Sequence, residues 1–237
     1  MKLLKARKAG QKAFPSDDIE SLVEKALKVV ADNFELYPEE FKRIQNDDVL
    51  EAIVRRVQPD HDITVTARNI DFEFYWEKKC KELKNCKKED HGGSFKQAFI
   101  ERRIQTLLEN QKDQASEHEL VKELKAARYE VFCLKIGQLP SHLDMSKVFE
   151  NLPNLSYLTI TYGCKHVGMQ YERPKFGMMM SDAQIFSECL KTTQSLVYLS
   201  LPGNLIDDDL VNILIKGLVL NKTISQLDLS HNKISNL

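Results

Sequence analysis

Apolar residues in the C-terminal half of the chain recur at a fixed period. The pattern L-x-x-L-x-L-x-x-N-x-I fits two segments, 196–206 and 224–234, whose starts are 28 residues apart. A pattern of this form with a period of about 20–29 residues is typical of leucine-rich repeats. One repeat cannot bury its apolar side alone, so neighbouring repeats stack. We therefore predict stacked parallel strands over this half of the chain.

Two weaker copies of the pattern precede these segments. They begin at Val131 and Leu155, 24 residues apart, and Leu139 and Gly163 stand where the asparagine is expected. The 41 residues from Leu155 to Leu196 exceed one period, so we predict an insertion within 162–180. The last copy has no helix before the sequence stops. We therefore expect about three and a half repeats, in a chain that is either a truncated form or fragment of a longer protein or has its C-terminal end covered by something else.

The chemistry of the repeat explains its spacing. Its leucines are expected to point to one side and to stack on their equivalents in adjacent repeats. The asparagine amide can donate and accept hydrogen bonds where the chain leaves the strand, which pairs backbone groups that would otherwise be buried alone. The predicted structural positions are Leu155, Leu158, Leu196, Leu199, Leu201, Asn204, Leu227, Leu229 and Asn232.

Helical spacing of apolar residues fills the remainder of the chain. Between the repeats it predicts helices near 145–152, 181–190 and 207–218, the last two capped by Ser181 and Asp207. Before residue 128 it predicts helices that start near Ser16, Pro38, Asp47 and Asp71, then two more over 95–108 and 120–124. A period of 28 residues leaves room for one helix per repeat, so the predicted solenoid is of the α/β, ribonuclease-inhibitor-like type.

The predicted organisation has three parts: a basic tail over 1–15, a helical module over 16–128, and leucine-rich repeats over 129–237. In the helical module, two short helices, a spacer and the motif Trp76-x-x-x-Cys80 resemble the F-box-like region of elongin-A-type proteins. That resemblance implies that the aromatic ring and the cysteine pack the last helix onto the others. The predicted fold class is therefore α/β, with an F-box-like module before a short solenoid.

Composition narrows the class of protein. The 237 residues carry a formal net charge of −1, whereas nucleic-acid-binding domains usually have a clear basic excess. No run approaches the ~18 uninterrupted apolar residues of a transmembrane helix. The five cysteines are scattered, which indicates a reducing intracellular compartment. They are Cys80, Cys86, Cys133, Cys164 and Cys189.

Three groups of residues contain side chains that could bind a metal, catalyse a reaction or bind phosphate. Cys80, Cys86 and His91 have the wrong spacing for common structural zinc sites and lack a fourth ligand nearby. Cys164 and His166 could form a nucleophile and a base, but a third orienting group and an oxyanion loop are missing. The lysines over 78–88 alternate with acids and are interpreted as a solvated helix face. We predict a non-enzymatic protein without cofactor or metal.

The strand residues between the leucines offer a contact surface instead. Alternate strand residues point to the opposite face, and tyrosines there combine apolar area with a polar tip, as is common in protein interfaces. We expect Tyr157 and Tyr198 to lie side by side, either as a partner contact or as an aromatic pair that stabilises the sheet. The candidate contact residues are Lys135, Tyr157, Thr159, Tyr198, Ser200, Gln226 and Asp228.

Several runs of residues resemble the dynein regulatory complex subunit 5 family, also called the t-complex-associated testis-expressed family. They lie at 152–155, 158, 162–163, 165 and 168–169, and earlier at 91–92, 94, 96, 99 and 101–102. The acidic run 207–209 and the run 227–232 are similar as well.

The resemblance implies a non-catalytic scaffold subunit of the nexin–dynein regulatory complex in motile cilia and flagella. Its partners would be other subunits of that complex, with doublet microtubules or dynein arms as further candidates, and not nucleic acid or a membrane. The implied location is the cytoplasm and cytoskeleton, in the axoneme. The alternative is a substrate receptor of a ubiquitin ligase, because such adaptors place an F-box-like region before leucine-rich repeats.

Overall fold

The computed structural model describes residues 21–83, 86–111, 117–140, 142–163 and 176–235. The predicted basic tail and the predicted helix start at Ser16 lie outside these ranges. The chain divides into two compact units, Met1–Gln58 and Pro59–Leu237. Every helix among the described residues is too short or too polar to cross a bilayer.

The first unit contains three helices, α1 (Leu22–Asp32), α2 (Pro38–Phe41) and α3 (Asp47–Val54). Ser21 and Glu24 form a capping box at the start of α1, and Asn46 caps α3. The rings of Phe34 and Phe41 are both buried and meet edge to face with centroids 4.6 Å apart. This aromatic contact forms the centre of a small core, which Ala31, Ile53, Val54 and Val57 complete.

The second unit begins with helices α4 (Ile63–Asn69), α5 (Glu73–Glu82), α6 (Phe95–Asn110) and α7 (Glu117–Ala126), with a short 3-10 turn η1 (Lys88–Asp90) before α6. Trp76 of α5 is fully buried, and its Nε1 donates to the Ile70 carbonyl at 3.0 Å. Its ring lies 5.7 Å from that of Phe99 on α6. The single tryptophan therefore joins α5 to α6.

Two local predictions for α5 were wrong. Asp71 does not cap the helix, because the N-cap residue is Phe72 and the Asp71 carboxylate pairs with Lys96. Lys79 is not on a solvated face: it is buried, and its Nζ donates to the His61 carbonyl at 2.7 Å. Burial lowers the pKa of Lys79 to about 8.

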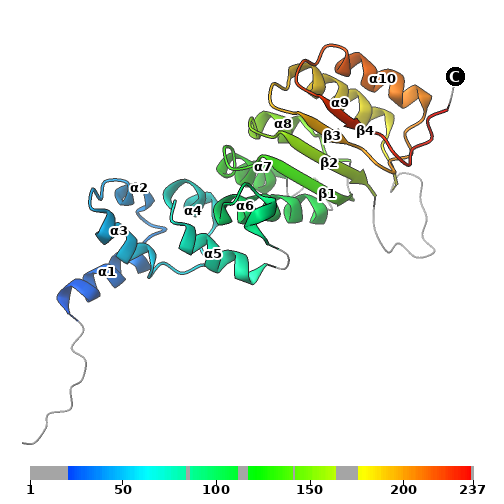
Figure 1. Ribbon diagram of the computed structural model, residues 1–237. Coiled ribbons are helices and arrows are strands. Elements are labelled where there is room, and N and C mark those ends of the chain that lie inside the picture. The colour runs from blue at the N-terminus through cyan, green and yellow to red at the C-terminus, as the bar shows by residue number, and fades with distance from the viewer. Residues whose placement is uncertain (1–20, 84–85, 112–116, 141, 164–175, 236–237) are drawn as a thin grey trace, which may run out of the picture. The chain divides into compact units, whose positions relative to one another are not determined.

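A parallel sheet follows, with strands β1 (Cys133–Leu139), β2 (Tyr157–Tyr162), β3 (Tyr198–Ser200) and β4 (Gln226–Asp228) in the order β1-β2-β3-β4. Helices α8 (Ser146–Asn151), α9 (Met180–Thr192) and α10 (Asp208–Leu218) connect the strands and lie along one side of the sheet (Figure 1). The predicted α/β class with a parallel sheet is confirmed.

The repeat positions form the core between sheet and helices. Leu134, Leu158 and Leu199 pair in register across the first three strands and are fully buried. The next residue in this row, Leu227 of the edge strand β4, is 45% exposed. Leu155, Leu196 and Leu201 are buried, whereas Leu229 is half-buried.

Of the two N-caps predicted for α9 and α10, only the one for α10 is confirmed. Asp207 accepts a hydrogen bond from the Leu210 amide, as predicted. Helix α9 begins at Met180, and the Asp182 carboxylate accepts from the Met179 amide, so Ser181 is not the cap. Ser181 is the second residue of the helix, so its side chain is not at the N-cap position.

The predicted insertion before α9 is only partly described. Residues 164–175 lie outside the described ranges, and Gly163 and Phe176 on either side form an antiparallel bridge. Gly177 has a φ of +73°, and an added Cβ would lie 2.5 Å from the Asn204 carbonyl oxygen, so only glycine fits. Met178 is buried and its amide donates to the same carbonyl, whereas Met180 is exposed.

We expect Gly217→Ala to destabilise the second unit by about 1–2 kcal/mol, although alanine is the better helix former. An added Cβ would lie 2.9 Å from the Ser187 Cα of α9 and closer still to its carbonyl oxygen. Overpacking costs about 1–3 kcal/mol and exceeds the ~1 kcal/mol gained in helix propensity. Urea unfolding followed by Trp76 fluorescence measures the change.

Asn212→Ala on the same helix is the matched control, because Asn212 is exposed. It is expected to leave stability unchanged or raise it by a few tenths of a kcal/mol. Equal behaviour of the two variants would contradict the close packing of α10 on α9.

Candidate protein-contact face

The predicted contact residues and Cys133 lie in two columns that are in register across the sheet. One column contains Cys133, Tyr157, Tyr198 and Gln226, and the other contains Lys135, Thr159, Ser200 and Asp228. Because alternate strand residues point to opposite faces, these columns lie on the face away from the buried leucines and from α8–α10. We call this set of eight residues the contact face.

A tyrosine stack occupies the centre of the contact face. The rings of Tyr157 and Tyr198 are parallel within 3°, and their centroids are 4.1 Å apart. Burial raises the pKa of the Tyr157 phenol, and the hydrogen bond with Tyr198 adds to this shift. The Tyr157 hydroxyl therefore stays protonated near neutral pH and can donate as well as accept. The stack offers a flat apolar patch with polar tips.

Opposite charges stand at the two ends of the contact face. The Lys135 ammonium lies 5.5 Å from the centre of the Tyr157 ring, at the β1 side. At the β4 side the Asp228 carboxylate accepts from the Ser200 hydroxyl at 2.8 Å and from the Ser230 amide at 2.9 Å. These hydrogen bonds, the one from the Ser230 backbone first, lower the pKa of Asp228. The face is thus positive at one end and negative at the other.

The predicted contact residues differ in how accessible they are. Lys135 and Gln226 are exposed, and Tyr157, Thr159, Tyr198 and Asp228 are half-buried. Ser200 is only 2% exposed, and its hydroxyl donates to the Asp228 carboxylate. Ser200 can therefore position Asp228 but has little surface of its own to offer a partner.

Glu101 of α6 holds the start of β1 in place, a role that no local pattern of residues indicates. The side chain is 1% exposed, and its Oε1 accepts from the Phe132 and Cys133 amides at 2.7 and 2.8 Å. The same oxygen accepts from Gln97 at 3.0 Å, and the other oxygen bonds to the His91 ring. This buried carboxylate ties the helical part of the second unit to the first strand of the contact face.

Two asparagines tie the strands to one another at the ends of β2 and β3. The Asn204 side chain is fully buried, accepts from the Tyr162 amide at 2.7 Å and donates to the Ile160 carbonyl at 2.8 Å. Asn232 repeats the arrangement one period later, with bonds to the Leu201 carbonyl and the Asn204 amide. Each asparagine therefore satisfies the backbone of the preceding strand.

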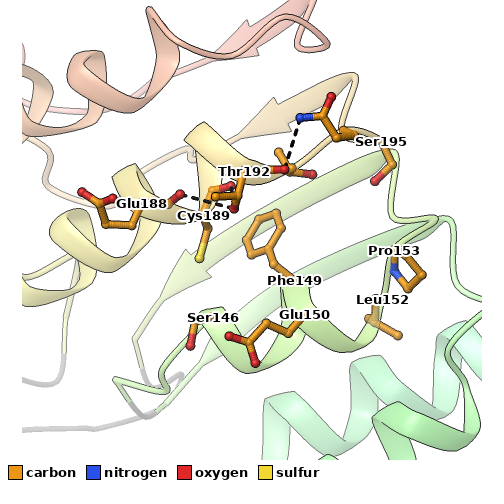
Figure 2. Close-up of a pocket in the computed structure, with 11 residues that line it drawn as sticks. Ser146, Phe149, Glu150, Leu152, Pro153, Glu188, Cys189, Thr192 and Ser195 are labelled. Carbon is orange, nitrogen blue, oxygen red and sulfur yellow. Dashed lines mark hydrogen bonds between the residues drawn. The ribbon is translucent and has the colours of Figure 1, made fainter.

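A pocket of about 470 Å³ lies between α8 and α9, on the side opposite the contact face (Figure 2). Phe149 and Cys189 line it, together with Glu150 and Glu188. Burial raises the pKa of the Cys189 thiol to about 12, so the sulfur is protonated and a poor nucleophile near neutral pH. No histidine is among the described residues that line the pocket.

The cysteines and histidines considered as metal or catalytic groups are not arranged as such a site among the described residues. Cys164 and His166 lie outside the described residues. The sulfurs of Cys80 and Cys86 are 2.7 Å apart, whereas the His91 ring is bound to Glu101. Among the described residues, no group of three or more His, Cys, Asp or Glu side chains is arranged to hold a metal ion.

The first unit has apolar surface of its own. Two grooves run beside α1, one of about 550 Å³ lined by Val29, Tyr37 and Phe41, and another of about 550 Å³ lined by Val23, Leu27 and Val49. Val30 and Ile44 line both grooves. Clustered apolar surface of this kind is typical of protein–protein contacts.

Comparison with known proteins gives consistent relatives, although no family model matches the chain. A Chlamydomonas reinhardtii protein is 38% identical over 190 residues, which cover 79% of this chain and 48% of that protein. A mouse protein is 27% identical over 231 residues, or 81% of this chain and 46% of its own length. A human protein is 25% identical over 215 residues, or 78% and 43%.

All three relatives carry the name dynein regulatory complex subunit 5. The chain spans about half of the length of these proteins. The matched part is more than three quarters of the chain, so both the helical part and the sheet contribute to the similarity. The chain belongs to the dynein regulatory complex subunit 5 family.

Proposed function

We propose that this chain is a non-catalytic scaffold subunit of the nexin–dynein regulatory complex in the axoneme of motile cilia or flagella. The observation that carries the proposal is the 38% identity to the Chlamydomonas protein of that name. Its partners are other subunits of the complex, with doublet microtubules or dynein arms as further candidates. Through these contacts it regulates dynein activity and ciliary motility.

The sheet is proposed to be a short leucine-rich-repeat solenoid that follows an F-box-like helical module. The 28-residue period supports it, since Asn204 and Asn232 make equivalent backbone bonds one period apart. The parallel register of Tyr157, Tyr198 and Gln226 supports it as well. In this arrangement the contact face is the surface that a neighbouring subunit covers.

Purification of the tagged chain from axonemes tests the proposed function. The expected result is recovery of other regulatory-complex subunits in constant ratio to the chain, after extraction in salt that releases loosely bound protein. A tagged, unrelated axonemal protein of similar size is the control. Recovery of the chain without any regulatory-complex subunit would contradict the proposal.

We expect Tyr198→Ala to weaken binding of the partner subunit by about tenfold, because aromatic contact residues commonly contribute about 1–2 kcal/mol. Tyr157→Ala should act in the same way, and the double variant should lose less than the product of the two, since one stack is removed. Quantitative pull-down against the isolated complex gives the affinities.

Tyr129→Ala is the matched control for this experiment. Tyr129 is an exposed tyrosine of the same unit, but it precedes β1 and lies outside the contact face. Partner affinity should be unchanged in this variant. A similar loss in all three variants, or in none of the stack variants, would remove the contact face from the proposal.

A second candidate function is that of a substrate receptor for a ubiquitin ligase. The apolar grooves beside α1, with Tyr37 and Val30 on their walls, are the observation that favours it, because a receptor must offer apolar surface to its adaptor. Co-purification with an elongin-type or Skp-type adaptor, lost in Tyr37→Asp, would support this function. If a crosslinked preparation contained neither an elongin-type nor a Skp-type adaptor, this function would be dismissed.

A further inference from the structure

We propose that Cys80 and Cys86 form a redox-modification site, in which a small-molecule disulfide such as oxidised glutathione converts the two thiols into an intramolecular disulfide. This site is independent of the contact face and of the proposed scaffold function. It was not foreseen from the spacing of the cysteines, which are six positions apart and were considered only as zinc ligands.

The two sulfurs are held together by the fold around them. Cys80 lies in the last turn of α5 and is buried, and its Sγ donates to the Phe95 carbonyl at 3.4 Å. Cys86 follows the end of the helix, and its Sγ lies 2.7 Å from that of Cys80. Both are free thiols. A disulfide needs Cβ atoms about 3.5–4.5 Å apart, and sulfurs this close require little movement of the backbone to reach it.

The surroundings give the two thiols different roles. Cys86 is half-buried, so an oxidant in solution can reach it, whereas Cys80 is only 4% exposed. Burial raises the pKa of Cys86, but the hydrogen bond with Cys80 and the positive charge of Arg102 act in the opposite direction. Burial also raises the pKa of Cys80, and the Cys86 thiol, Glu73 and Glu77 add to that shift. Cys86 is therefore the attacking thiol and Cys80 the resolving one.

The reaction proceeds in two exchange steps. The Cys86 thiolate attacks one sulfur of oxidised glutathione, the glutathione disulfide breaks, and one glutathione leaves as a thiolate. The Cys80 thiolate then attacks the Cys86 sulfur of the mixed disulfide and displaces the second glutathione. The protein loses two protons and two electrons, and one glutathione disulfide becomes two glutathione thiols.

The bond would fasten the end of α5 to the segment that leads into α6. Trp76 is one helical turn before Cys80 and packs against Phe99, so α5 and α6 share the core that this cross-link would brace. A cross-link restricts the unfolded chain, which raises the stability of the folded one. Oxidation is therefore expected to raise the urea midpoint reported by Trp76 fluorescence.

The test uses the purified full chain in glutathione buffers of increasing oxidised fraction. Remaining thiols are alkylated, and peptide mass spectrometry follows each of the five cysteines separately. We expect the fragments with Cys80 and Cys86 to be recovered as one linked species, with the loss of two free thiols, while Cys133 and Cys189 remain alkylatable. The linkage should form more slowly in Arg102→Gln.

Cys86→Ser should leave Cys80 reduced under the same buffers, and Cys133→Ser is the control that should leave the Cys80–Cys86 linkage intact. The proposal is overturned if Cys80 and Cys86 stay alkylatable while other cysteines carry glutathione. It is equally overturned if Cys86 keeps its glutathione, or if it links two chains instead of bonding to Cys80. None of these outcomes changes the result of the axonemal purification.

Discussion

Glu101→Ala is expected to lower the free energy of unfolding of the second unit by about 3–5 kcal/mol, because several groups lose their buried hydrogen-bond acceptor at once. The substitution removes the acceptor for the Phe132 and Cys133 amides and leaves the His91 ring without its carboxylate. Each unpaired buried group costs about 1–3 kcal/mol. Urea unfolding followed by Trp76 fluorescence measures the loss.

Two variants separate the effect of these bonds from a general effect of mutation on α6. Glu101→Gln keeps an oxygen that can accept from both amides, so its loss should be smaller than that of alanine. Glu109→Ala removes a carboxylate on the same helix that accepts only one strand amide, from Gly137 at 3.0 Å. It should cost about 1 kcal/mol. If Glu101→Ala cost no more than Glu109→Ala, the role of Glu101 as the tie to β1 would be wrong.

Asn204→Ala is expected to destabilise the second unit by about 2–4 kcal/mol. It leaves the Tyr162 amide and the Ile160 carbonyl, both at the end of β2, buried without partners. The contact face should be affected too, because Tyr157 lies on the same strand. The measurement is the urea midpoint, together with partner affinity in the pull-down assay.

Asn232→Ala is the matched control for Asn204, since it removes equivalent bonds one period later at a half-buried position. Water can replace part of what is lost there, so we expect a cost of about 1 kcal/mol. Asn204→Asp tests the donor separately, because a carboxylate can accept from Tyr162 but cannot donate to Ile160. Equal stability of Asn204→Ala and wild type would contradict the role of Asn204 in tying β2 to the next strand.

The helices that the sequence predicted best are those with long apolar stripes. Helix α6 (Phe95–Asn110) and helix α10 (Asp208–Leu218) lie within a few residues of the predicted ranges. Helix α4 (Ile63–Asn69) was not predicted. It is short and begins Ile-Thr-Val-Thr, and β-branched residues have low helix propensity. Its Asp62 cap and its packing against α7 stabilise what the local sequence does not.

The register of the contact-face residues could be predicted from the sequence, but the buried side chains that hold the strands in place could not. A repeat of fixed period places equivalent residues side by side, so the row from Tyr157 to Gln226 could be deduced from spacing alone. Glu101 lies 31 residues before Phe132, outside the repeat, and nothing local indicates that its carboxylate will be buried under β1.

The amino-acid sequence by itself determined the α/β class, the parallel order of the strands and the composition of the contact face, because periodic apolar residues can be buried together in few ways. Only the tertiary structure decided which polar groups are buried with them: Lys79 against the His61 carbonyl, Glu101 under β1, and the sulfurs of Cys80 and Cys86 against each other. The physical reason is that apolar burial follows local periodicity, whereas the pairing of a buried polar group depends on atoms that distant segments bring to it.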